Sequence, residues 1–295
     1  MAKNKKVDVP ADSVYMNLLT DFGFKKIFSD TELLIDFLCS LTSVQIKEVH
    51  YKPTEHLGDF KTERKAVFDL LCTNEDGEYF LVEMQKAPQD YFADRALFYT
   101  SFLIRNQAPK TKSWNYKLKA VYFVGILDFS LHETEQDKEV IERASLINER
   151  THESFSDKLK FIYIQLPHFT KELKDLKTNA DDWLYCLKNM DKFNNKPAEV
   201  QGRIFERLFY IARTDKLSDK EMETYNKSIL EYNDVRNVAD YAKRIGRQEG
   251  RQEGRQETLT NLAIKYARKG MNIVEIADLT DLPIERVKEI LQKMN

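Results

Sequence analysis

The sequence predicts an α/β protein with a mixed central sheet flanked by helices, followed by an all-α C-terminal region. Short runs of bulky, β-branched and aromatic residues, typical of strands, recur between residues 46 and 166. Segments with apolar residues at helical spacing precede these runs and lie between them. From residue 181 onward only the helical pattern continues. Strands that alternate with helices in this way form a sheet with helical covers.

Each element has its own pattern. Residues 14–41 predict two helices with a break near residues 29–31, and residues 89–107 predict a third. The Asp76-Gly77 pair favours a tight reversal, so the two strands around it should form a hairpin. The last two strands are continuously apolar, as expected for central strands buried on both faces. The five predicted strands are residues 46–51, 66–72, 79–84, 120–126 and 160–166.

Composition excludes several classes of protein. The 295 residues allow about two domains. A net charge of -2, from 46 basic and 48 acidic residues, excludes binding to nucleic acid or lipid through a uniformly basic surface. The three cysteines have neither the number of a disulfide framework nor the spacing of a zinc site, which fits a reducing compartment. With no signal peptide and no run of ~18 apolar residues, we expect a cytoplasmic protein without a membrane partner.

The predicted organisation has four parts. Buried stripes in the helical extension should include Phe205, Leu208 and Phe209, and later Ile229, Tyr232 and Val235. The parts are an α/β core at residues 1–180, the helical extension at 181–243, a linker at 244–257 and a small tail at 258–295.

The linker repeats Gly-Arg-Gln-Glu three times. A period of four places like charges at i and i+4 on a helix, and each glycine costs about 1 kcal/mol, so an isolated helix should be weak. Two interpretations stay open. The segment is a solvated linker, or its glycine stripe pairs with a second copy and makes the protein a homo-oligomer, most simply a dimer.

The tail predicts three short helices over residues 259–268, 273–279 and 284–294. Asn272 and Glu275 form a capping-box pattern, and Pro283 suits a first helical turn. Short helices joined by short turns are typical of a helix-turn-helix module and equally of a simple three-helix packing unit.

Two carboxylates on the predicted hairpin are the strongest chemical signal. Asp69 lies inside the apolar run AVFDLLC, and Glu83 lies near the end of the next run, FLVEMQK. A carboxylate in a buried strand is costly unless it is paired or binds a cation. Because strand side chains alternate, Glu83 and Gln85 share a face and should point toward Asp69. Carboxylates suit Mg²⁺, which completes its coordination with water and phosphate oxygens. An alternative is structural ion pairing of Asp69 with Arg64 or Lys65 and of Glu83 with Lys86.

This pattern resembles the PD-(D/E)XK nuclease superfamily. The motifs TDFGFKKIF at residues 20–28, VFDL at 67–70, VEMQ at 82–85 and RALFY at 95–99 resemble, more narrowly, the Rpn family of recombination-promoting nucleases and transposases. The resemblance covers about the first two-thirds of the chain. It implies a restriction-endonuclease-like core and Mg²⁺-dependent cleavage of DNA, with Mn²⁺ as a second candidate ion.

The resemblance also implies residue roles. Asp69 and Glu83 would hold the metal, and Gln85 would replace the superfamily lysine that positions the attacking water. Glutamine can orient water but brings no positive charge. Arg95 and Tyr99, at i and i+4 on one helix face, would contact phosphate or brace Glu83, or else be ordinary surface and core residues. Direct contact with DNA is a further candidate role for Asp21, Lys25 and Lys26, beside a helix cap at Asp21 and solvated lysines.

We therefore expect a divalent-metal-dependent DNA endonuclease associated with recombination or transposition, acting as an oligomer. One alternative is a catalytically weak protein that keeps the fold and binds DNA or another protein. Another is a helical scaffold that assembles partners.

Overall fold

A computed structural model describes residues 13–56, 66–109, 114–131 and 139–293. The chain divides into two compact units, Met1–Arg236 and Asn237–Asn295. No helix in the described ranges is long and apolar enough to cross a membrane. The helices are α1 (Asp21–Phe28), α2 (Thr31–Thr42), α3 (Phe92–Arg105), α4 (Asn179–Asn189), α5 (Arg203–Ile211), α6 (Asp219–Arg268), α7 (Ile273–Thr280) and α8 (Ile284–Gln292).

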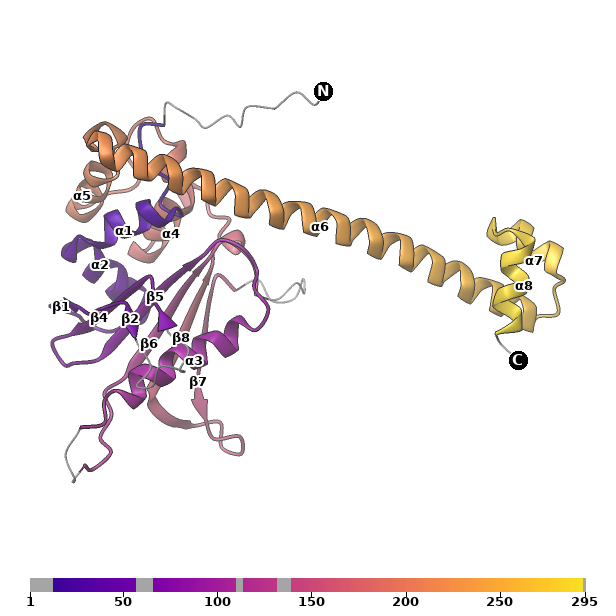
Figure 1. The fold of residues 1–295 in the computed structure, drawn as a ribbon, viewed down its shortest axis with the longest axis horizontal. Coiled ribbons are helices and arrows are strands. Elements are labelled where there is room, and N and C mark those ends of the chain that lie inside the picture. The colour runs from indigo at the N-terminus through magenta and orange to yellow at the C-terminus, as the bar shows by residue number, and fades with distance from the viewer. Residues whose placement is uncertain (1–12, 57–65, 110–113, 132–138, 294–295) are drawn as a thin grey trace. The chain divides into compact units, whose positions relative to one another are not determined.

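The first unit contains a six-stranded mixed sheet in the order β1-β4-β5-β6-β8-β7 (Figure 1). Strands β5, β6 and β8 run parallel in the centre, and the outer pairings are antiparallel. The strands of this sheet are β1 (Val49–Tyr51), β4 (Leu70–Asn74), β5 (Tyr79–Gln85), β6 (Val121–Leu127), β7 (Ile141–Ile147) and β8 (Ser154–Gln165), and a separate short pair joins β2 (Glu55–His56) to β3 (Ala66–Val67).

The predicted α/β fold class is confirmed, with differences in individual elements. The run at residues 66–72 is divided into β3 and β4, and Asp69 lies at the bend between them rather than inside a strand. Strand β7 was not predicted, because most of its residues are exposed and it lacks a continuous apolar run. The predicted hairpin is present, with Gly77 at φ 76° in its turn.

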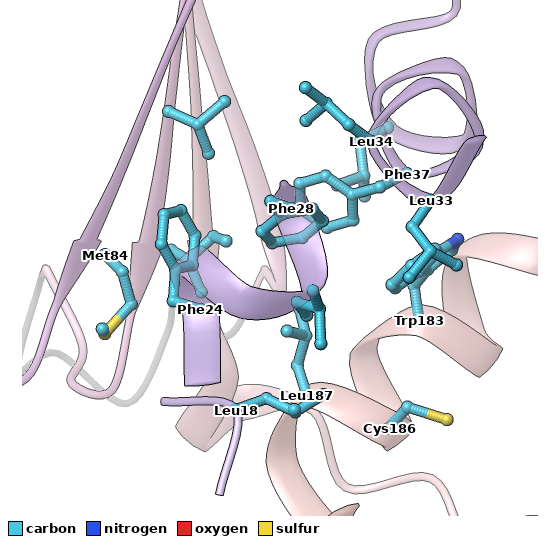
Figure 2. Close-up of a cluster of buried hydrophobic side chains, with 14 of the residues drawn as sticks. Leu18, Phe24, Phe28, Leu33, Leu34, Phe37, Met84, Trp183, Cys186 and Leu187 are labelled. Atoms are coloured by element: carbon cyan, nitrogen blue, oxygen red, sulfur yellow. The ribbon is translucent and has the colours of Figure 1, made fainter. Parts of the chain in front are cut away.

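Two apolar layers cover the sheet. Alternate residues of β5 point to opposite faces, so Phe80, Val82 and Met84 join one cluster while Leu81 joins the other. The first cluster packs α1, α2, α4, α5 and the start of α6 against the sheet, and the second packs α3 against it. Figure 2 shows Phe24 of α1 beside Met84 and Trp183 of α4 beside Phe37 of α2. Helix α1 is thus fixed between strand β5 and the helical layer.

The C-terminal helices differ from the prediction in two ways and agree with it in a third. Helix α6 continues without interruption through the repeat to Arg268, so residues 259–268 are its last turns and not a separate helix. Val235, predicted to be buried, is 40% exposed. The two short helices α7 and α8 are present, and the Asn272–Glu275 capping box forms as predicted. They pack on the end of α6 around Ala263, Ile276 and Val287.

Candidate active site

The β4–β5 hairpin brings Asp69 and Glu83 together. The register pairs Leu70 with Val82, so Asp69, one residue before β4, lies beside Glu83. The backbone N–H of Asp69 donates to Oε1 of Glu83 at 3.2 Å. In return, the backbone N–H of Met84 donates to Oδ2 of Asp69 at 2.8 Å. Because the chain bends at Asp69, its N–H is available for the carboxylate, and each acidic side chain is held by the backbone next to the other.

These carboxylates carry more negative charge than their surroundings neutralise. Glu83 is 1% exposed. Burial, followed by the charge of Asp69, raises the pKa of Glu83 to about 8, although Arg95 acts in the opposite direction. Burial also raises the pKa of Asp69, and the nearby charge of Asp21 adds to the effect while Lys25 and Arg95 oppose it. A cation between or beside the two side chains would relieve this repulsion.

Four side chains form a closed hydrogen-bonded ring around Glu83. Arg95 donates to Oε2 of Glu83 at 3.3 Å and to Oε1 of Gln89 at 2.7 Å. Gln89 Nε2 then donates to Oε1 of Gln85 at 3.0 Å, and Gln85 Nε2 donates to Oε2 of Glu83 at 3.2 Å. The directions follow from chemistry: because the guanidinium only donates, Gln89 accepts through its oxygen and donates through its nitrogen, and Gln85 then does the same. Both amides therefore have one orientation consistent with the whole ring.

The ring agrees with part of the sequence prediction and adds a residue to it. Glu83 and Gln85 point to the same side as predicted, and Arg95 reaches Glu83 from α3. Gln89 was missed, because it lies in the connection between β5 and α3 and belongs to no motif. Its only sequence signal is its position between VEMQ and Arg95.

Helix α3 supports Arg95 through an aromatic contact. The guanidinium lies 4.9 Å from the centre of the Tyr99 ring, and that ring packs at 5.1 Å against Phe68, which directly precedes Asp69. The ion-pair partner of Glu83 is Arg95 rather than Lys86. The alternative partners of Asp69, Arg64 and Lys65, lie outside the described residues.

The candidates on α1 divide into two groups. Thr20 caps the helix by accepting from the N–H of Gly23, so of the alternatives left open for Asp21 the helix cap is wrong. Asp21 instead pairs with Lys25 at 2.8 Å, and both lie close enough to Asp69 to influence its pKa. Lys26 turns away to pair with Glu221 at the start of α6.

The donor set fits a divalent hard cation. Among the described residues no group of three or more His, Cys, Asp or Glu side chains gathers as a complete cage. Mg²⁺ does not require one, because it binds through one or two carboxylates and takes its other ligands from water and phosphate. Two adjacent carboxylates with raised pKa values meet that requirement. An ion of this type neutralises phosphate charge and lowers the pKa of bound water.

Comparison with known proteins identifies the family of the chain. No curated protein and no solved structure matches the chain. A family model described as PD-(D/E)XK nuclease family transposase matches residues 18–242, which include both carboxylates, the ring and the start of α6. The resemblance seen in the motifs is thereby confirmed, and the mixed sheet with flanking helices is the fold expected for it. The chain belongs to the PD-(D/E)XK nuclease family of transposases.

Proposed function

We propose that this chain is a divalent-metal-dependent DNA endonuclease that hydrolyses phosphodiester bonds during recombination or transposition. The observation that carries the proposal is the pair Asp69 and Glu83, two neighbouring carboxylates with raised pKa values at one end of the hairpin. Such a pair is costly for a fold without a cation. Membership in a nuclease family supports DNA as the substrate.

Each residue of the site has a role in this proposal. Asp69 and Glu83 hold the ion, Mg²⁺ or Mn²⁺. Gln85 orients a water molecule through its amide, whose direction is fixed by Gln89 and Glu83. Arg95 supplies the positive charge that a glutamine lacks, because its guanidinium already contacts Glu83. Lys25, 56% exposed, is available to meet the DNA backbone near Asp69.

The helices after the sheet support this site. We propose that residues 1–180 carry the chemistry and that residues 181–243 close the apolar face behind it. Trp183, Phe205 and Tyr225 are buried in the same cluster as Met84, the neighbour of Glu83. Residues 244–257 then connect this part to the tail at 258–295. The thiols of Cys72 and Cys186 are unpaired and buried, which supports a reducing cytoplasmic location.

The second candidate function is DNA binding without turnover. The observation that favours it is Gln85, which stands where related nucleases carry a lysine. The contact between Arg95 and Glu83 favours the enzyme instead, because the charge is present on a neighbouring element.

A nicking assay tests the proposal. The full chain is incubated with supercoiled plasmid in Mg²⁺, in Mn²⁺ and in EDTA, beside Asp69→Ala and Glu83→Ala. We expect nicking only with metal and a loss of at least about a hundredfold in each variant. Asp90→Ala, an exposed acid in the loop before α3, is the matched control and should retain full activity. Cleavage in EDTA, or cleavage unaffected by both substitutions, would contradict the proposal. DNA binding without metal-dependent cleavage would favour the second candidate.

A further inference from the structure

The middle of α6 contains no buried side chain in the described part of the chain, and Leu259, near its end, packs only partly against the C-terminal cluster. Every residue from 237 to 262 is described and none is buried. Protein helices of this kind usually gain their stability from a packed face. Gly246, Gly250 and Gly254 weaken the helix by about 1 kcal/mol each relative to alanine. A Cβ at any of them would meet nothing within 4 Å, so packing within the chain does not require glycine there.

The charges of the same segment also lack partners. The three arginines and three glutamates of the repeat are separated from one another by two, six or ten residues. Helix side chains interact at separations of three and four, so no arginine can pair with a glutamate along this helix. Among the residues that the structure describes, no ion pair involves any of the six, Arg247, Arg251, Arg255, Glu249, Glu253 and Glu257.

The helix sorts these side chains onto separate faces. Successive residues are turned by about 100°, so arginine and glutamate flank the glycines on opposite sides. The glutamines lie on the face behind the glycines. The glycine face is therefore a shallow surface with one positive margin and one negative margin.

We propose that this face of residues 246–257 binds the same face of a second copy of the chain, with the two helices parallel. A two-fold axis along the helices places the arginine margin of each copy against the glutamate margin of the other, on both flanks. A two-fold axis across the helices makes them antiparallel and opposes arginine to arginine and glutamate to glutamate. Charge complementarity thus selects the second copy as the partner and the parallel orientation.

A parallel pair accounts for the two features that one chain leaves unexplained. Glycines at i and i+4 allow two helix backbones to approach closely, which an alanine would hinder. All six charges gain partners across the pair. Because each Met1–Arg236 unit is continuous with the N-terminal end of its own helix, both units leave the pair at the same end. The pairing itself does not depend on nuclease activity.

A charge-exchange variant of the full chain tests both the partner and the orientation. In this variant the arginine and glutamate of every repeat change places, as Arg247→Glu with Glu249→Arg and likewise at 251/253 and 255/257. Its composition and net charge equal those of the wild type. We expect each protein to form its own dimer in analytical ultracentrifugation. Differently tagged copies of the two should not form mixed dimers, because a parallel mixed pair opposes like charges.

A second set of variants breaks the interface on one side. Replacing only the three arginines by glutamate should weaken dimerisation at least about tenfold. In 0.5 M salt the wild-type dimer should also be weaker, because salt screens the charge pairs. The matched control is Gln248→Ala, Gln252→Ala and Gln256→Ala, which changes the far face of the same helix without adding a charge that could pair with an arginine, and it should leave the dimer intact.

Several outcomes would overturn the proposal. A monomeric wild-type chain would remove the second copy as the partner. Preferential mixed dimers with the charge-exchange variant would show antiparallel helices. An arginine reversal that lowers affinity for DNA and leaves the oligomeric state unchanged would identify nucleic acid as the partner of this face.

Discussion

The hairpin site and the repeat segment of α6 both contain glutamate and arginine. In the hairpin site the glutamate is buried and contacts the arginine, whereas in the repeat segment these side chains are exposed. Glu83 is buried, and the loop at Asp69, the strand residue Gln85 and helix residue Arg95 all contact it. The glutamates of the repeat are exposed and contact no basic side chain within the described part of the chain.

The difference favours a different kind of partner for each region. Around Glu83 the fold supplies donors, yet the pKa values of Glu83 and Asp69 stay raised, which supports the proposed binding of a cation at this point. Along the repeat, arginine and glutamate are equal in number, so what is missing is a surface with the opposite order of charges. A buried site with an excess of negative charge predicts a small cationic ligand. An exposed surface with equal numbers of positive and negative side chains predicts a macromolecular partner.

The largest expected effect comes from removing the charge of Glu83. Since burial and Asp69 raise its pKa to about 8, the folded metal-free protein holds a proton that the unfolded chain releases above about pH 4.5. Stability from this group is therefore present at low pH and is lost as the pH rises from about 5 to 8. In EDTA, Glu83→Gln should be more stable than the wild type at pH 8, on the order of a few kcal/mol, and equal to it near pH 4.

Urea unfolding followed by tryptophan fluorescence measures this difference, because Trp183 is fully buried in the first unit. Mg²⁺ should stabilise the wild type and leave Glu83→Gln much less affected, since ligand binding to the folded state stabilises it. An unchanged pH dependence in Glu83→Gln would show that this carboxylate carries no excess charge.

The next effect tests whether Arg95 supplies the charge missing from Gln85. Arg95→Ala should lower the rate of metal-dependent cleavage about 10- to 100-fold, because the guanidinium that contacts Glu83 and Gln89 is lost. Adding Gln85→Lys should restore part of that rate, since it returns a positive charge to the same place. Gln85→Lys alone should keep or raise the activity. A double variant no better than Arg95→Ala would contradict the shared role.

The sequence predicted the site where its geometry is local. The hairpin follows from Asp76-Gly77, and the shared face of Glu83 and Gln85 follows from strand alternation, so both could be inferred from adjacent residues. The bend at Asp69 could not, because the apolar run through it resembles an unbroken strand. Gln89 and its link to Arg95 depend on the path of the connection after β5, which no periodic pattern encodes.

The C-terminal region shows the same limit in a different form. The capping box at Asn272 was predictable because its two residues are three apart. The unbroken course of α6 was not, since glycines and repeated charges disfavour an isolated helix. The cap of α1 was also not predictable, because threonine and aspartate both suit an N-cap. The backbone conformation makes Thr20, and not the neighbouring Asp21, the capping residue.

The smallest expected effects compare glycines in the two regions. A Cβ at Gly23 would overlap the backbone oxygen of Asn17 and lie 2.9 Å from Oγ1 of the capping residue Thr20, so Gly23→Ala should destabilise the first unit by about 1–3 kcal/mol. Gly250→Ala meets no atom and should stabilise its helix by about 0.5–1 kcal/mol, seen as higher helicity by circular dichroism.

The repeat variant should also show a second, opposite effect. If two copies pair through the glycine face, the new methyl group separates the helices, and Gly250→Ala should weaken the dimer while it strengthens the helix. Sedimentation measures the first quantity and circular dichroism the second, in the same sample. If both the helicity and the dimer affinity increased, the pair would tolerate a methyl group on this face. The glycines would then be required neither by the single chain nor by the pair.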